Sequence, residues 1–296
     1  CGVCHTDLHL IRGDLPLRRC PIVPGHQIVG RVLTAGEGAD SALIGRRVGV
    51  PWLSTACGNC GQCAAGRENL CQDATFTGWD RDGGFAEAVA VPARAAHPLP
   101  TAFGDVEAAP LMCAGVIGFR SLRLAGAGRG TRLGLFGFGA SAHLSLQVAR
   151  AMGSEVLVFT RSAEHRRLAI DLGAVWAGSA TDEIDEPLDC AITFAPVGWI
   201  VREALRLVGP GGTVAINAIH LDEVPPLDYA QHLYQERVLR SVTNLTHDDA
   251  REFLEVAAEC SLHPKTEVFE LERANEVLER VAASTVDGAA VLVPER

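Results

Sequence analysis

The chain has 296 residues, 48% hydrophobic and 21% charged, which is an ordinary globular balance with enough apolar material for about two domains. The 26 Lys and Arg against 36 Asp and Glu give a formal charge of −10, which repels nucleic-acid backbones and anionic membranes. No apolar run reaches the roughly 18 residues of a membrane span, and no charged segment followed by an apolar one opens the chain. We therefore expect a cytoplasmic protein that binds neither nucleic acid nor membrane.

The first part of the chain is predicted to be rich in β-structure. Short apolar runs bounded by Gly or Pro predict strands at Ile28–Leu33, Arg47–Val50 and Phe85–Val91. The loops of residues 1–117 carry eight of the ten Cys and four of the ten His residues of the chain, so this region is where we expect metal chemistry.

From about Thr131 onward, strand and helix signals alternate, which is typical of a doubly wound parallel sheet and an α/β fold. Strands are predicted at Arg132–Phe136, Glu155–Phe159, Asp189–Phe194 and Thr213–Ile219, and helices at Ala140–Met152, Ala163–Leu172 and Val201–Val208, with a turn at Gly209–Gly212. The tail is predicted to form helices at Asp248–Ala258 and Glu272–Ala283 and a strand at Ala289–Val293.

Cysteines cluster in one short segment, at Cys57, Cys60, Cys63 and Cys71. Four thiolates can surround Zn²⁺ tetrahedrally, and a C-x-x-C turn presents two sulfurs to one ion. Unconnected thiols or two disulfides are the alternatives, but adjacent C-x-x-C disulfides are strained and no secretory signal indicates an oxidising compartment. The spacing predicts a structural zinc site, and such a closed site leaves no coordination position for catalysis.

A second group of potential ligands lies near the start, where Cys4 and His26 occur with Asp7. A catalytic zinc needs two or three nitrogen or sulfur ligands and one open position, and Cys113 could supply the third ligand from a distant loop. Asp7 could accept a hydrogen bond from the outer nitrogen of His26 and so fix its tautomer. The alternative is a structural histidine and a small buried cysteine.

A dinucleotide fingerprint, G-x-G-x-x-A, is formed by Gly137, Gly139 and Ala142, directly after a predicted strand and at the start of a predicted helix. The first glycine allows the tight turn, the second lets the backbone approach a pyrophosphate, and the third small residue allows close packing. A plain tight turn is the alternative, but the strand–turn–helix context favours a nucleotide site.

The next predicted strand ends without the carboxylate that usually binds the ribose hydroxyls of NAD. It ends instead in Thr160, Arg161 and Ser162. An arginine fork with hydroxyls on either side suits a 2′-phosphate, so NADP(H) is favoured over NAD(H). An arginine pointing into solvent is the alternative.

These pieces, in this order, resemble the zinc-dependent medium-chain alcohol dehydrogenases. The resemblance runs from Cys1 to the end and includes Gly2-Val3-Cys4-His5-Thr6-Asp7-Leu8-His9, Pro24-Gly25-His26, Gly66-x-Glu68-Asn69-Leu70-Cys71 and Ala114-Gly115 after Cys113. It implies a β-rich GroES-like catalytic domain at 1–117 and 248–296, and a Rossmann cofactor domain at 118–247.

The resemblance also implies roles for single residues. Cys4, His26 and Cys113 would hold a catalytic zinc, giving two Zn²⁺ per chain with the four-cysteine site. His5 would contact the cofactor pyrophosphate, and Thr6 and His9 would relay the alcohol proton to solvent. Trp52 and Trp79 could wall a hydrophobic substrate pocket, or could simply pack.

The chain departs from the family pattern in three places. Gln27 follows the histidine ligand, where the family usually has Glu, and Ala142 replaces the third glycine. The family also has further β-structure ahead of the position of Cys1, so we expect the first strands of the catalytic domain to be missing.

The implied activity is hydride transfer between a small-molecule alcohol or aldehyde and a nicotinamide cofactor. Zinc-free quinone or enone reductases of the same fold are an alternative, and bound metal would distinguish them. A zinc-stabilised binding or regulatory protein without turnover is another. Family members pair through an edge strand of the cofactor domain, here expected at Leu239–Leu245, so the resemblance implies a homodimer or homotetramer.

Overall fold

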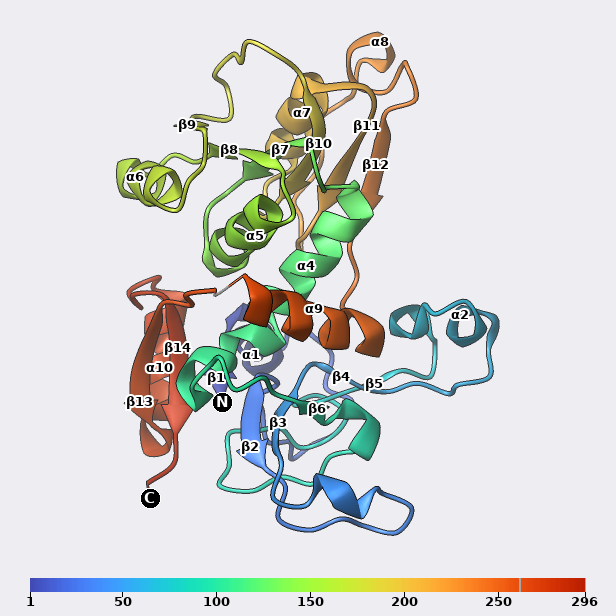
Figure 1. The fold of residues 1–296 in the computed structure, drawn as a ribbon, viewed down its shortest axis with the longest axis vertical. Helices are drawn as coiled ribbons and strands as arrows, with labels where there is room; N and C mark the ends of the chain where they lie inside the picture. Colours follow the sequence, from blue (N-terminus) through green and yellow to red (C-terminus); the bar gives the residue numbers. More distant parts are fainter. Residues whose placement is uncertain (261, 296) are drawn as a thin grey trace. The chain divides into compact units, whose positions relative to one another are not determined.

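The computed structural model describes residues 1–260 and 262–295 (Figure 1). The chain divides into two compact units: the first contains Cys1–Val116 and Asn244–Arg296, and the second contains Ile117–Thr243. The first unit is therefore built from the two ends of the chain, and the second is one continuous segment between them.

The described residues of the first unit form short sheets. Its strands are β1 (Gly2–Val3), β2 (Ile28–Arg31), β3 (Arg47–Val50), β4 (Leu53–Thr55), β5 (Thr75–Phe76), β6 (His97–Pro98), β13 (Thr266–Glu270) and β14 (Ala289–Val293). They are ordered β1-β14-β13, β2-β3-β6 and β4-β5. β1 pairs antiparallel with β14, so Gly2 lies opposite Val291.

Helices and 3₁₀ turns connect these strands. The helices are α1 (His5–Arg12), α2 (Gly61–Ala64), α3 (Asp105–Ala108), α9 (His247–Glu259) and α10 (Ala274–Ala282), with 3₁₀ turns at Ser41–Leu43, Glu68–Leu70, Ala93–Ala95, Pro110–Met112 and Leu271–Arg273. α9 begins at Thr246 because a capping box satisfies its first amides: the Asp249 amide donates to the Thr246 hydroxyl, and the Thr246 amide donates to the Asp249 carboxylate.

The second unit is a six-stranded, fully parallel sheet in the order β12-β11-β10-β7-β8-β9. Its strands are β7 (Arg132–Phe136), β8 (Glu155–Phe159), β9 (Trp176–Gly178), β10 (Leu188–Thr193), β11 (Val208–Ile216) and β12 (Val238–Ser241). Its helices are α5 (Ala140–Ala151), α6 (Ala163–Asp171), α7 (Gly198–Leu207) and α8 (Tyr229–His232), and α4 (Ala114–Ala125) crosses into it from the first unit.

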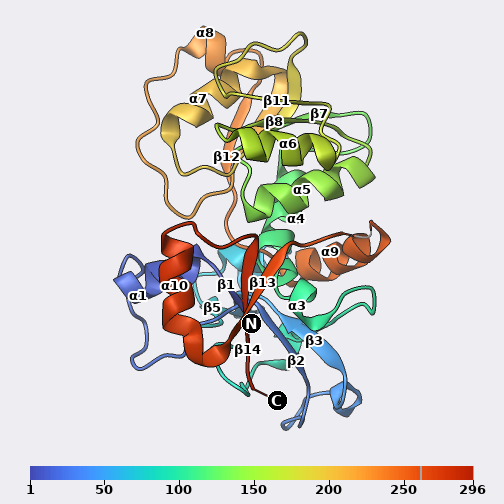
Figure 2. The same cartoon turned by 90° about the vertical axis from the view of Figure 1, so that its left-hand side faces the viewer.

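This strand order is that of the doubly wound dinucleotide-binding fold, with the order reversing between β7 and β10. Figure 2 shows α5 and α6 on one face of the sheet and α7 on the other. Phe136 and Phe159 lie opposite each other in β7 and β8 and stack with ring centroids 4.2 Å apart in the buried core. The fold class predicted from the sequence is confirmed.

The strand predicted at Phe85–Val91 is wrong. The structure has bends and irregular backbone there, and the segment pairs with no strand among the described residues. The predicted alternation survives in the packing, because Val89 and Val91 lie against the cluster of Ile28, Val50 and Ala95. Ala86, Ala88 and Ala90 are small, and they contribute little of the cross-strand side-chain contact that stabilises a sheet.

Several boundaries in the second unit also differ from the prediction. The strands expected at Thr213–Ile219 and Leu239–Leu245 end earlier, at Ile216 and Ser241. The turn predicted at Gly209–Gly212 lies inside β11, where the register with β10 shifts between Leu188 and Cys190. A positive φ of 72° at Gly211 lets the strand continue through this irregularity. The helix predicted from Val201 begins earlier, at Gly198, whose amide donates to the Asp222 carboxylate.

Among residues 1–260 and 262–295, no single helix has the length and apolar character needed to cross a membrane. One bent pair, Asp105–Met112 with Ala114–Ala125, passes by length and composition alone, with an angle of 43° between its halves. Core helices of water-soluble proteins pass the same test.

Candidate functional site

The first candidate site is organised by the start of α1. Cys4 is the N-cap residue, and its sulfur accepts the amide hydrogen of Thr6. Asp7, three residues further on, accepts the amide hydrogen of Cys4 and closes a capping box. The helix cap therefore holds a thiol in a fixed direction and buries a carboxylate, which is 3% exposed, directly behind it.

His26 and Cys113 converge on the same thiol. The Nε2 atom of His26 lies 3.4 Å from the Cys4 sulfur, and the ligand atoms of Cys4, His26 and Cys113 all lie within 4.8 Å of one another. The other ring nitrogen of His26, Nδ1, lies 3.2 Å from the Asp7 carboxylate, which also accepts the Gly25 amide hydrogen. Asp7 therefore fixes the ring so that Nε2 points toward the two sulfurs.

Charges in this cluster shift the pKa values of its members in opposite directions. The hydrogen bond with Cys113 and the charge of His26 lower the pKa of the Cys4 thiol well below its usual value, although burial opposes this. The same bond, with burial, raises the pKa of Cys113. Burial opposes a charge on His26, but Asp7 and Cys4 raise its pKa well above the usual value. These shifts favour a Cys4 thiolate beside a protonated His26, and a bound divalent cation would take the place of the protons on His26 and Cys113.

The separation of these ligand atoms suits zinc. Tetrahedral bonds of about 2.3 Å to sulfur and about 2.0 Å to nitrogen place the two ligand atoms about 3.5 Å apart, and Cys4 and His26 match this spacing. Three protein ligands leave one tetrahedral position open. This is the arrangement of a catalytic rather than a structural zinc site.

Aromatic rings lie beside this cluster. The ring of Trp52 lies 6.1 Å from that of His26, and it stacks on Trp79 at 6.0 Å. The Trp79 indole N–H donates to the Pro16 carbonyl, which fixes the ring. Trp52 therefore lies beside a candidate zinc ligand and packs on Trp79, and their role as a wall of a substrate pocket stays a prediction.

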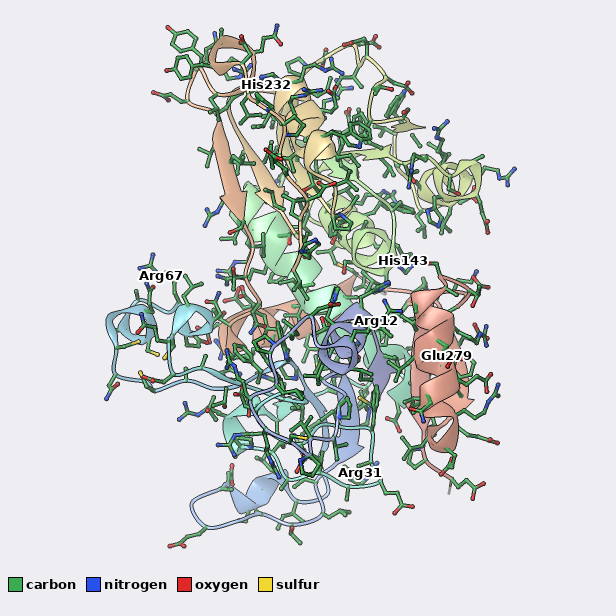
Figure 3. All side chains as sticks on the ribbon, turned by 180° about the vertical axis from the view of Figure 1, so that it is seen from behind. Arg12, Arg31, Arg67, His143, His232 and Glu279 are labelled. Atoms are coloured by element: carbon green, nitrogen blue, oxygen red, sulfur yellow. The ribbon has the colours of Figure 1, made fainter. Side chains whose placement is uncertain are left out.

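The four-cysteine loop forms a second cluster of potential metal ligands. The ligand atoms of Cys57, Cys60, Cys63 and Cys71 lie within 4.8 Å of one another, with Cys57 3.5 Å from Cys71 and 3.9 Å from Cys63. Sulfurs around a tetrahedral zinc are about 3.8 Å apart. In Figure 3 the sulfur atoms gather in the loop that carries Arg67. The Cys63 amide lowers the pKa of Cys60 to about 7, which favours the thiolate form.

α1 also carries the other residues to which the family resemblance assigns a role, namely His5, Thr6 and His9. His5 is exposed at its first turn, and Thr6 is 8% exposed. His9 lies one turn after Thr6, and its Nδ1 is 2.8 Å from a carboxylate oxygen of Asp14. The pattern did not single out Asp14; the only signal was its position just after the helix-ending Gly13.

The glycine-rich turn connects β7 to α5 in the second unit. Gly137 has a positive φ of 94°, and a Cβ there would lie 3.1 Å from the Ala195 amide nitrogen. Gly139 is different, because a Cβ there would meet nothing within 4 Å and the helix start has no side-chain cap. The open space above Gly139 and the uncapped amides fit a bound pyrophosphate. Ala142 is fully buried.

The end of β8 holds the residues predicted to choose the cofactor. Thr160 is 9% exposed, Arg161 is exposed, and the Ser162 hydroxyl caps α6 by accepting the His165 amide hydrogen. Sequence reasoning missed Arg166, whose Nε donates to the Thr160 carbonyl at 2.8 Å. This bond ties a second guanidinium to the strand end. Arg166 stands four residues after Ser162, the residue that caps α6, and this spacing was the signal that could have identified it.

Comparisons with known proteins agree with this architecture. The model of the alcohol dehydrogenase GroES-like domain matches residues 1–101, and that of the zinc-binding dehydrogenase domain matches residues 142–259. The fold and the two matches define a zinc-binding dehydrogenase.

Individual relatives narrow the assignment. The chain is 49% identical to a probable alcohol dehydrogenase of Mycobacterium tuberculosis, over 99% of this chain and 86% of the relative, and 37% identical to an alcohol dehydrogenase of Geobacillus stearothermophilus, over 99% and 88%. The chain belongs to the zinc-dependent medium-chain alcohol dehydrogenase family.

Solved structures share the fold. A cinnamyl alcohol dehydrogenase from Sorghum bicolor superposes with a TM-score of 0.87 at 29% identity, covering 99% of this chain and 87% of that one. A putative zinc-binding dehydrogenase from Sinorhizobium meliloti, bound to NADP, gives a TM-score of 0.87 at 28% identity, covering 99% and 90%.

Proposed function

We propose that this alcohol dehydrogenase interconverts a small-molecule alcohol and its aldehyde with NADP(H), at a catalytic zinc held by Cys4, His26 and Cys113. The observation that carries the proposal is the convergence of these three residues, from distant parts of the chain, in front of the buried Asp7 carboxylate. The alcohol dehydrogenase relatives support the substrate class.

The bound groups would supply the electrophilic chemistry: zinc as a Lewis acid toward the alcohol oxygen, and the nicotinamide as hydride acceptor. The protein residues orient the reactants and move a proton. Asp7 holds the His26 ring, and Trp52 and Trp79 offer an apolar face to the carbon side of the substrate. Thr6 accepts the alcohol proton as its own hydroxyl proton passes to His9, from which it reaches solvent.

The second unit would bind the cofactor. Gly137, Gly139 and Ala142 would receive the pyrophosphate at the start of α5, and His5 would contribute a contact from α1. Arg161, Thr160 and Ser162 would bind a 2′-phosphate, with Arg166 as a further donor. NADP in the Sinorhizobium neighbour supports this preference.

The four-cysteine loop would hold a second, structural zinc, for two per chain. We also propose a homodimer or homotetramer that pairs through β12, which is the edge strand of the second unit's sheet. The many thiolate ligands favour a reducing compartment, so a cytoplasmic location is proposed.

The deciding experiment measures alcohol oxidation with NADP⁺ and NAD⁺, together with bound zinc, for the wild type and His26→Ala. We expect wild-type turnover and two zinc equivalents. His26→Ala should lose turnover and one equivalent while remaining folded, because the four-cysteine site is untouched. His220→Ala, a change at an exposed histidine, is the matched control. Near-normal turnover of His26→Ala would refute the catalytic assignment.

A further inference from the structure

The turn that follows α1 folds back onto the helix and delivers a carboxylate to it. Gly13 ends the helix in the left-handed conformation, with φ of 80°, and its amide donates to the Leu10 carbonyl. The Leu15 amide donates to the carbonyl of His9. Asp14, between these two anchored residues, therefore lies over the last turn, where its Oδ2 is 2.8 Å from Nδ1 of His9.

This contact selects one form of the imidazole. A carboxylate at neutral pH can only accept hydrogen bonds, so the hydrogen between the two groups belongs to Nδ1. In neutral His9 the other nitrogen, Nε2, then carries a free lone pair. A neutral His9 without this partner would be free to place its hydrogen on Nε2, where it could accept no proton.

The tautomer of His9 matters because of where this residue lies on α1. Thr6 and His9 are three residues apart on a helix, so their side chains lie on the same face. The Cys4 thiol lies at the start of that helix, and Thr6 near it is buried. The side chains of His9 and Asp14 are 31% and 57% exposed. The helix thus runs from the candidate metal cluster to a solvent-exposed pair.

We propose that Asp14 is a positioning residue for proton transfer, holding His9 in the tautomer whose Nε2 can accept the proton released during alcohol oxidation. The inference rests on the proposed function. One proton moves from the alcohol to the Thr6 oxygen as the Thr6 hydroxyl proton moves to a bridging water, that water passes one of its own protons to Nε2, and bulk water then removes the proton from Nε2. Asp14 acts only through the His9 ring and touches neither substrate nor cofactor.

The first test reads the tautomer directly and needs no turnover. Long-range ¹H–¹⁵N NMR of the zinc-loaded protein, without cofactor, distinguishes the two neutral tautomers, and the His9→Gln spectrum identifies the His9 signals. We expect the Nδ1–H form in the wild type and a substantial Nε2–H population in Asp14→Asn. Asp14→Glu should retain the wild-type form, and Glu37→Gln, which removes an exposed charge elsewhere, should have no effect. An unchanged tautomer in Asp14→Asn would overturn the proposal.

The second test measures the pre-steady-state rate of NADPH formation at saturating alcohol. Asp14→Asn should slow this phase about tenfold, at the low end for residues that orient an imidazole, with the KM for NADP⁺ unchanged. In a His9→Gln background the same change should have no further effect. A tenfold loss in both backgrounds, or no loss in the wild-type background, would show that Asp14 does not act through His9.

The two tests separate this inference from the proposed function. If the wild type forms no NADPH or NADH with any alcohol, the proposed function fails. The NMR measurement would still show whether Asp14 sets the His9 tautomer. If the wild type is active and the tautomer does not depend on Asp14, only this inference fails.

Discussion

The sulfur of Cys71 lies 3.5 Å from that of Cys57, although 14 positions separate the two residues in the chain. The loop between them contains α2 and a 3₁₀ turn, and few of its side chains are buried. Such a loop has little apolar packing to hold its ends together. A metal ion bound by its four cysteines would take that role.

We expect Cys63→Ser to lose one zinc equivalent and to lower the melting temperature, because three thiolates hold the ion less tightly and the loop has no core of its own. Cys20→Ser, at an exposed cysteine outside both clusters, should change neither property. Elemental analysis and thermal unfolding measure both effects. A normal zinc content in Cys63→Ser would show that the four-cysteine loop is not a metal site.

The glycines of the β7–α5 turn offer a matched pair of substitutions. Gly139→Ala should leave stability nearly unchanged, since its methyl group meets open space, but should weaken NADPH binding at least tenfold by occupying the space of the pyrophosphate. Gly137→Ala should instead destabilise the protein by about 1 kcal/mol or more, because a positive φ strains alanine. Fluorescence titration with NADPH and urea unfolding separate the two effects. Equal binding by Gly139→Ala would argue against a cofactor at this turn.

Cofactor choice is tested at the end of β8. Arg161→Ala should lower kcat/KM for NADP⁺ about tenfold with little change for NAD⁺, because one charge-assisted hydrogen bond contributes about 1.5–3 kcal/mol. Arg166→Ala should act in the same direction. Arg202→Ala, which removes a guanidinium on α7 in the same unit, is the control. A wild-type enzyme that works tenfold better with NAD⁺ would contradict the proposed preference.

The His97–His247 pair predicts a loss of stability in acid. Their facing nitrogens are 3.3 Å apart. Burial, with the charges of His247 and Arg251, lowers the pKa of His97 to about 4, and burial also lowers that of His247, where Glu68 and Asp248 oppose the shift and Arg94 adds to it. Folding therefore favours neutral His97. The contribution of this residue to stability is complete above about pH 6.5, the ordinary pKa of histidine in an unfolded chain, and is lost as the pH falls toward 4, the pKa of His97 in the folded protein.

We expect this loss to reach about 2 kcal/mol between pH 7 and pH 5 for His97 alone. His97→Gln, which has no charge to gain, should show a correspondingly smaller loss. His220→Gln, at an exposed histidine, should behave as the wild type. Urea unfolding at the two pH values measures the difference. The same acid sensitivity in His97→Gln would mean that other groups dominate the titration.

Sequence patterns predicted the second unit well because its signals are local. Buried runs such as Arg132–Phe136 and Glu155–Phe159 alternate with helices, and the glycine motif marks the turn between them. The strand at Phe85–Val91 failed because alternation of apolar residues shows which side chains face inward, and not whether a neighbouring strand is available to the backbone.

The candidate sites likewise differ in how far local sequence patterns predict them. Four closely spaced cysteines predict their own cluster. Residue types alone left the grouping of Cys4, His26 and Cys113 open beside a structural reading, and the family resemblance favoured it, because this grouping depends on long-range folding. The contacts of Asp14 with His9 and of Arg166 with Thr160 depend on how a turn or a helix directs one side chain. Composition and spacing do not contain that information.

The pairing of Gly2 with Val291 has a consequence for biosynthesis. A ribosome synthesises the whole second unit, Ile117–Thr243, before it synthesises β14, the strand with which β1 pairs. The second unit can therefore fold during translation, whereas the first unit completes its β1–β14 pairing only after β14 emerges. Nascent chains should acquire protease resistance within Ile117–Thr243 before they acquire it in the two segments that form the first unit.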